Sequence, residues 1–111
     1  LPMFRTFVSS PYTAWCLEGV AALLSAEARY ALAVQTCAVA AALRTQAQTP
    51  LPPSEQAAFA RTVADARTAL GEPALRAQWK VGTRRPHSAI IAQVISLRTH
   101  RRKLAKIAAQ K

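Results

Sequence analysis

The chain has 111 residues, room for one small domain with a limited core, and its apolar content of 51% is largely alanine, since only 6% is aromatic. Its net charge is +10, of which residues 84–111 contribute eight bases and no acid, and residues 1–83 seven bases and five acids. This composition favours closely packed helices, and Glu18, Glu27 and Arg29 interrupt the longest apolar stretch before it could span a membrane.

The uneven charge divides the chain into a nearly neutral body, residues 1–83, and a basic C-terminal segment, residues 84–111. We predict a helical-repeat-like module over the first range and a basic amphipathic helix over the second. The sequence opens on Leu1-Pro2, without an initiator methionine or a secretory signal pattern. We therefore expect it to be a piece of a longer protein with no secretory address.

Two helices are predicted in the first half of the body, at about residues 12–27 and 28–47, as an antiparallel pair with a short turn at 26–29. Small residues in both helices allow their axes to approach closely. The face of the first helix that we expect to pack on its neighbour holds Trp15, Gly19, Val20, Ala22, Leu23 and Leu24, and the second is lined by Leu32, Val34, Val39 and Leu43.

The segment "QTPLPPSEQ" follows, with three prolines in four positions that end the second helix and keep the connector extended. Ser54 is the expected N-cap of the next helix, with Glu55 in its first turn. That helix should run to Leu70 and end at Gly71 in a left-handed conformation. Its apolar stripe has regular helical spacing and consists of Phe59, Val63, Ala66 and Leu70.

A shorter helix is predicted from Glu72-Pro73 to Gly82, anchored by Leu75 and Trp79 one turn apart. A last helix, about residues 88–109, is amphipathic and strongly basic. Its apolar side carries Ile90, Val94, Leu97, Leu104 and Ala108. The fold class is therefore all-α, an antiparallel helical hairpin followed by two or three further helices.

Several segments together resemble a known family. They are "WCLEGVAALLSAE" and "AALRTQAQTPLPPSEQAAFARTVADARTALGEPALRAQWKVG", which are similar to the end of the tetratricopeptide-like helical-repeat region in bacterial signal-transduction ATPases and LuxR-type or adenylate-cyclase-linked transcriptional regulators. The resemblance covers about residues 14–82. Its matched positions include Leu17, Glu18, Gly19, Ala21, Ala33, Ala42, Leu43, Arg44, Pro50, Leu51, Pro52, Pro53, Glu55, Ala69, Leu70, Gly71, Glu72, Trp79 and Gly82.

The resemblance implies a tetratricopeptide-like hairpin and a sensing or protein-interaction role in a bacterial regulator, without catalysis. The chain departs from the family at Ala28 and Tyr30, where the family usually has glycine and proline. It departs again beyond Gly82, where the family tends to an acidic helix and this chain is basic. Family function therefore does not extend to the basic tail.

Catalytic patterns are missing from the sequence. The five acids are scattered one per segment, and no nucleophile–base pair, phosphate-binding loop or His-Glu-x-x-His pattern occurs. His87 and His100 are thirteen positions apart, which is no chelating spacing on one helix face. We expect neither an enzyme nor a bound cofactor or metal.

Cys16 and Cys37 flank the predicted turn, so a disulfide between them is geometrically conceivable, but we favour two buried free thiols that pack as small apolar residues. So few cysteines favour a reducing cytoplasm. Trp15 and Trp79 suit a ligand or a stacked base, yet we expect both to fill grooves between helices.

Function should therefore follow from surfaces. A short helical stack leaves an apolar end that another repeat, a second copy or a partner helix can cover. The residues expected to form this core and its exposed edge are Leu23, Leu32, Phe59, Val63, Leu75 and Trp79.

The basic tail supports an alternative, a nucleic-acid-binding protein, although a solvated or partner-binding helix is favoured. The residues that would contact phosphates are Arg98, Arg101, Arg102, Lys103 and Lys106. No aromatic residue follows Trp79, which argues against stacking on single strands and against anchoring in lipid. A second alternative is an open reading frame without function that folds because alanine-rich helices fold easily.

Overall fold

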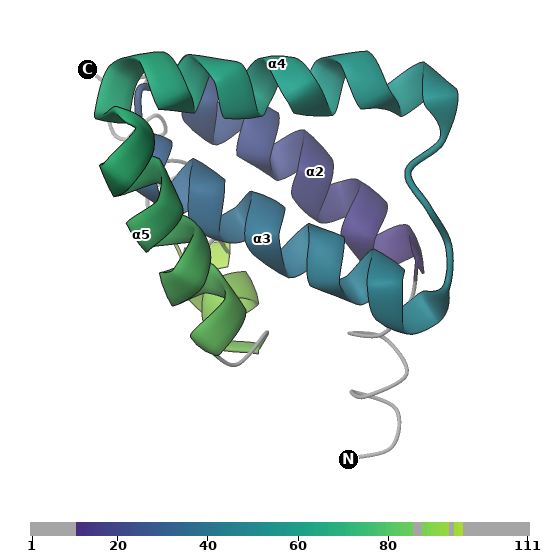
Figure 1. The fold of residues 1–111 in the computed structure, drawn as a ribbon. Helices are drawn as coiled ribbons and strands as arrows, with labels where there is room; N and C mark the ends of the chain where they lie inside the picture. The colour runs from purple at the N-terminus through teal and green to yellow at the C-terminus, as the bar shows by residue number, and fades with distance from the viewer. Residues whose placement is uncertain (1–10, 86–87, 94, 97–111) are drawn as a thin grey trace, which may run out of the picture.

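The computed structural model describes residues 11–85, 88–93 and 95–96, and the regular secondary structure in these ranges is α-helix, without a strand (Figure 1). The helices are α2 (Pro11–Ala26), α3 (Tyr30–Ala47), α4 (Pro53–Leu70) and α5 (Glu72–Arg84), followed by helical residues at 88–93 and 95–96. The all-α fold is as predicted. No helix in the described ranges is both long and apolar enough to cross a membrane.

The helices α2 and α3 form an antiparallel hairpin, joined by a turn at 27–29 close to the predicted one (Figure 1). Ala28 takes a left-handed conformation in this turn, with φ at 61°. The buried hydrophobic residues of α2 are Ala14, Leu17, Ala21 and Leu24, and the small polar residues Thr13 and Ser25 are also buried. Gly19 and Ala22, expected on the packed face, are exposed instead, so the predicted face of α2 was wrong in part.

The central helix is α3, which contacts α2, α4 and α5. Such a helix must be apolar nearly all round, and half of the residues of α3 are alanine or valine. Its buried residues are Ala33, Val34, Thr36, Cys37, Ala38, Val39, Ala40 and Leu43. The hydroxyl of Thr36 is satisfied within the helix, since it donates to the Leu32 carbonyl at 2.7 Å.

The proline connector lies between α3 and α4 and turns the chain so that α4 runs back across the hairpin (Figure 1). Gln48 ends α3 in a left-handed conformation, with φ at 55°. The expected Ser54 cap was wrong, because α4 starts at Pro53 and its N-cap is Pro52, two residues before Ser54. Proline suits this place, since its fixed φ fits the first helical turn and its missing N–H is not needed there. Glu55 lies in the first turn, as predicted.

The helix α5 follows Gly71, whose φ of 87° only glycine adopts without strain. The prediction that Gly82 ends α5 was wrong. The helix continues to Arg84, and Gly82 is buried within it. A Cβ at Gly82 would lie 2.7 Å from the Gln35 carbonyl oxygen and 2.9 Å from the Ala38 Cβ. This glycine therefore allows α5 to approach the α3 backbone.

Two hydrophobic clusters hold the helices together. The first lies between α2, α3 and the helical residues after 88, and contains Ala14, Leu17, Leu24, Ala33, Val39, Ala40, Leu43 and Ile90. The second joins α3, α4 and α5 through Val34, Ala66 and Leu75, with Tyr30, Val63, Leu70 and Trp79 partly buried against them. Because α3 contributes to both clusters, it links the hairpin to the rest of the molecule.

Candidate functional site

An apolar groove runs between α2 and α4, and we call it the α2–α4 groove. It encloses about 480 Å³ and is lined by Trp15, Cys16, Glu18, Gly19, Val20, Ala22 and Leu23 of α2, by Leu51 of the connector, and by Glu55, Ala58, Phe59 and Thr62 of α4. Its walls are mostly carbon. It lies on the face of α2 that does not pack on α3.

The α2 wall exposes large apolar side chains. Trp15 is 50% exposed and Leu23 is 48% exposed. Gly19 lies between them, and a Cβ added there would meet no atom within 4 Å. The α2 side of the groove therefore has large side chains at both ends and a gap at Gly19 between them. Trp15 lines this groove with half of its surface exposed and is not buried between helices, which corrects the packing role expected for it.

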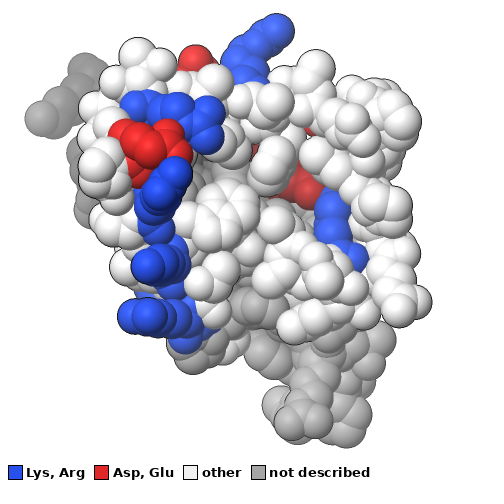
Figure 2. Space-filling view, in the orientation of Figure 1, with Lys and Arg blue, Asp and Glu red and all other residues white. Residues whose placement is uncertain are grey.

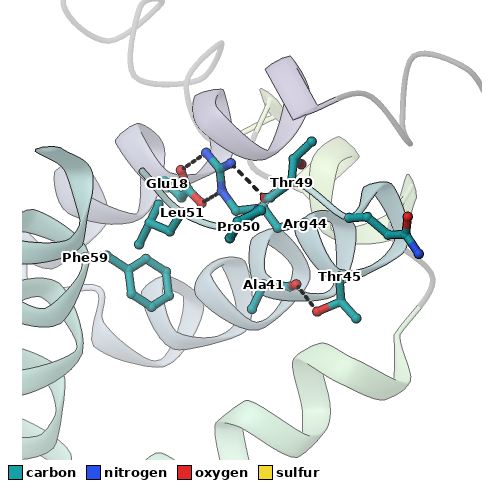
Figure 3. Close-up of a pocket in the computed structure, with 9 residues that line it drawn as sticks. Glu18, Ala41, Arg44, Thr45, Thr49, Pro50, Leu51 and Phe59 are labelled. Atoms are coloured by element: carbon teal, nitrogen blue, oxygen red, sulfur yellow. Dashed lines mark hydrogen bonds and ion pairs between the residues drawn. The ribbon is translucent and has the colours of Figure 1, made fainter. Parts of the chain in front are cut away.

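A second cavity of about 400 Å³ adjoins the groove under the proline connector and shares Glu18, Leu51 and Phe59 with it (Figure 3). Arg44 of α3 and Glu18 of α2 form a bidentate ion pair here. The Arg44 Nε donates to Glu18 Oε2 at 2.5 Å and its Nη2 donates to Oε1 at 2.8 Å. Another nitrogen, Nη1, donates to the carbonyl oxygen of Thr49 at 3.3 Å.

Both side chains of this pair are nearly buried, with exposed fractions of 10% for Glu18 and 11% for Arg44. The hydrogen bonds to Glu18 raise the pKa of the Arg44 guanidinium above its ordinary value, so this guanidinium stays charged. It joins α2, α3 and the connector at one point. The sequence resemblance matched both residues but assigned them no role. The available signal was Glu18 itself, an acid three and four residues from the buried Ala21 and Ala14.

The predicted interaction residues separate into two groups. Leu23 and Phe59 line the groove. The other four lie elsewhere: Leu32 packs on the first cluster, Leu75 is buried in the second, and Val63 and Trp79 pack against the second. Trp79 therefore packs between helices as predicted. The predicted phosphate-binding residues, Arg98, Arg101, Arg102, Lys103 and Lys106, lie outside the described residues, as do His87 and His100.

The cysteines are separate free thiols, so the conceivable disulfide is not formed. Cys16 is exposed in the groove, contrary to the buried position expected, whereas Cys37 is buried in α3. Burial, with a smaller contribution from the Glu18 charge, raises the pKa of the Cys37 thiol to about 12. Within the described ranges, no group of three or more His, Cys, Asp or Glu side chains is placed to hold a metal ion.

Basic side chains collect on another part of the surface, over α5. Figure 2 shows them as a column along the left edge, with acidic groups near its upper end. Comparison of the chain with protein-family models, with curated proteins and with solved structures found no match. The function must therefore be argued from the groove and from this basic surface.

Proposed function

We propose that the protein is a non-catalytic interaction module whose α2–α4 groove binds an amphipathic α-helix of a partner protein. The observation that carries the proposal is the pair of large apolar side chains, Trp15 and Leu23, half exposed on one wall and facing a groove shared with Phe59. Recognition of a helix in an apolar groove relies on such anchors.

The dimensions of the groove suit a helix. Trp15 and Leu23 are eight residues apart on α2, which places them about 12 Å apart along the helix axis. An α-helix with its side chains is about 10 to 12 Å wide, so a crossing helix fits between them. Gly19 and Ala22 are small and exposed at that place, which allows the two backbones to approach closely.

Charge favours a different protein over a second copy. Each chain carries a net charge of +10, so two copies repel each other, whereas an acidic partner is attracted. The resemblance to bacterial regulators is compatible with a partner helix in the rest of a larger regulator. In each case the module acts by holding a helix, with Trp15 and Phe59 as the main apolar contacts.

The proposal is tested by selecting amphipathic helical peptides from a display library against the full chain and measuring their affinity for two variants. Gly19→Leu places a large side chain in the groove, and its Cβ meets no atom of this chain within 4 Å, so the fold should persist while binding weakens at least tenfold. Ala77→Leu introduces the same side chain at an exposed position of α5, away from the groove, and should leave affinity unchanged.

Three results would contradict the proposal. The library yields no helical binder, or the binders are insensitive to Gly19→Leu, or light scattering shows a dimer that Gly19→Leu dissociates. The last result would mean that a second copy covers the groove. Circular dichroism of both variants checks that any loss of binding is not loss of helix.

A further inference from the structure

One face of α5 carries three cations at intervals of four residues: Arg76, Lys80 and Arg84. We call them the α5 basic stripe. Positions four apart on an α-helix share a face and are about 6 Å apart along its axis. All three residues are exposed, and Figure 2 shows basic side chains as a column over α5. The stripe is therefore a row of positive charge about 12 Å long.

Within the described residues, one of these three cations is paired with an acid. Glu72 is the one acid of α5, and it receives hydrogen bonds from Arg67 at 2.6 Å and from Arg76 at 3.3 Å. These contacts, the Arg67 hydrogen bond first, hold the pKa of the Glu72 carboxyl below its ordinary value. Lys80 and Arg84 have no ion pair within the described part of the chain.

The stripe is held on a firmly packed helix. Leu75 is buried in the second cluster, and Gly82 lies against the α3 backbone. Hydrogen bonds to Gln35 add to this packing, since its Nε2 donates to Gln78 Oε1 at 2.7 Å and its Oε1 accepts from Arg85 Nη1 at 2.9 Å. The apolar face of α5 thus faces the core and the basic face points to solvent.

We propose that the α5 basic stripe binds the phosphate backbone of duplex nucleic acid, independently of base sequence. Rows of exposed Lys and Arg supply such binding through phosphate contacts and counterion release. The +8 charge of residues 84–111, which begins in the stripe at Arg84, adds to the attraction. This function is separate from helix binding in the α2–α4 groove and does not depend on it.

The surroundings favour a duplex over other polyanions. Single-strand binding uses aromatic platforms, but Trp79, the aromatic residue of α5, packs partly buried against the second cluster. Insertion into an acidic membrane needs a broad apolar face beside the cations. On α5 that face is packed on α3 and α4, and Val81, 38% exposed, is the large apolar side chain left outside.

The test measures binding of the full chain to a labelled DNA duplex of about 20 base pairs, two helical turns, over a series of salt concentrations. Each phosphate contact contributes about −0.9 to the slope of log affinity against log salt. The double variant Lys80→Gln/Arg84→Gln should therefore lower the steepness of that slope by about 1.8. The matched control Arg29→Gln/Arg61→Gln removes the same charge from the α2–α3 turn and from α4, and should leave the slope unchanged.

An RNA duplex of the same sequence should bind with the same dependence on Lys80 and Arg84, because the contacts are to phosphates. The inference is overturned if the chain has no affinity for duplexes at low salt, or if both double variants weaken binding equally, which would make net charge the cause. It is also overturned if neither variant changes the slope. Equal affinity for a single strand, or Lys80-dependent binding to phosphatidylserine vesicles but not to duplexes, would assign the stripe to another polyanion.

Discussion

Gly19 and Gly82 both lie inside helices, where glycine is about 1 kcal/mol less favourable than alanine. The two glycines differ in whether their surroundings have room for a larger side chain. Gly82 is buried against α3, and the nearest atoms to a Cβ there belong to the backbone of Gln35, which cannot move aside easily. Gly19 faces open space in the α2–α4 groove, so nothing in this chain requires it. A required glycine and an optional one thus occupy similar sequence contexts.

Alanine at these two positions should change stability in opposite directions. Gly19→Ala should raise the free energy of unfolding by about 0.5 to 1 kcal/mol, because it removes backbone entropy from the unfolded chain. Gly82→Ala should lower it by about 1 to 2 kcal/mol, because a Cβ 2.7 Å from the Gln35 carbonyl oxygen forces α5 away from α3. Urea unfolding followed by circular dichroism measures both changes. Stabilisation by Gly82→Ala would show that α5 does not approach α3 this closely.

At the scale of the elements, the ion pair between Glu18 and Arg44 connects α2, α3 and the proline connector. Its two charges are almost out of water and satisfy each other through two hydrogen bonds, while a third bond reaches Thr49 (Figure 3). The pair between Arg67 and Glu72 has similar chemistry, but its side chains are 52% and 43% exposed. Solvent screens the exposed pair and leaves the nearly buried one strong.

Removing the acid should therefore have unequal effects at the two pairs. Glu18→Gln leaves the Arg44 charge without its carboxylate and should destabilise the protein by about 3 kcal/mol. Glu72→Gln is the matched control, and its effect should be too small to resolve in the same urea titration. Equal losses in the two variants would contradict the assignment of Glu18 and Arg44 as the link between the hairpin and the connector.

At the scale of the whole molecule, the helical residues beyond 88 belong to the packing of the hairpin. Ile90 is fully buried in the cluster formed by α2 and α3, with Ile91 partly buried against it. This contact joins the start of the basic segment to the neutral body. The charge distribution in the sequence divides the chain at residue 84. If the two segments share a core at Ile90, they should unfold together.

Ile90→Ala should lower the free energy of unfolding by about 2 to 4 kcal/mol, through lost burial and a cavity between α2 and α3. The transition should remain single, because the side chain lies in the shared core. Ile95→Ala is the control, since Ile95 is 57% exposed, and should change stability by less than about 0.5 kcal/mol. An unchanged main transition in Ile90→Ala would show that residues 84–111 unfold as a separate unit.

Local signals in the sequence determined the helical fold and most of its boundaries. Helix ends are marked by the prolines of the connector and by Gly71 before α5. These residues restrict the backbone only within a few positions, so their effect can be predicted without the fold. Leu75 and Ile90 were also predicted on apolar faces and are buried. Ser54 shows the limit of such signals, because Pro53 competes with it for the same helix start.

Only the tertiary structure decided which surfaces are free. The helix α2 has apolar residues on more than one side, with Trp15 and Leu23 on one and Leu17 and Leu24 on another, so its periodicity did not identify the buried face. Leu17 and Leu24 are buried because they pack against α3. Trp15 and Leu23 line the groove because α4 lies opposite them. The partner of Glu18 and the role of Gly82 are likewise contacts with α3, 26 and 44 or more positions away along the chain. The candidate site therefore depends on how the helices pack against one another. The residue pattern of a single helix carries no information about those contacts.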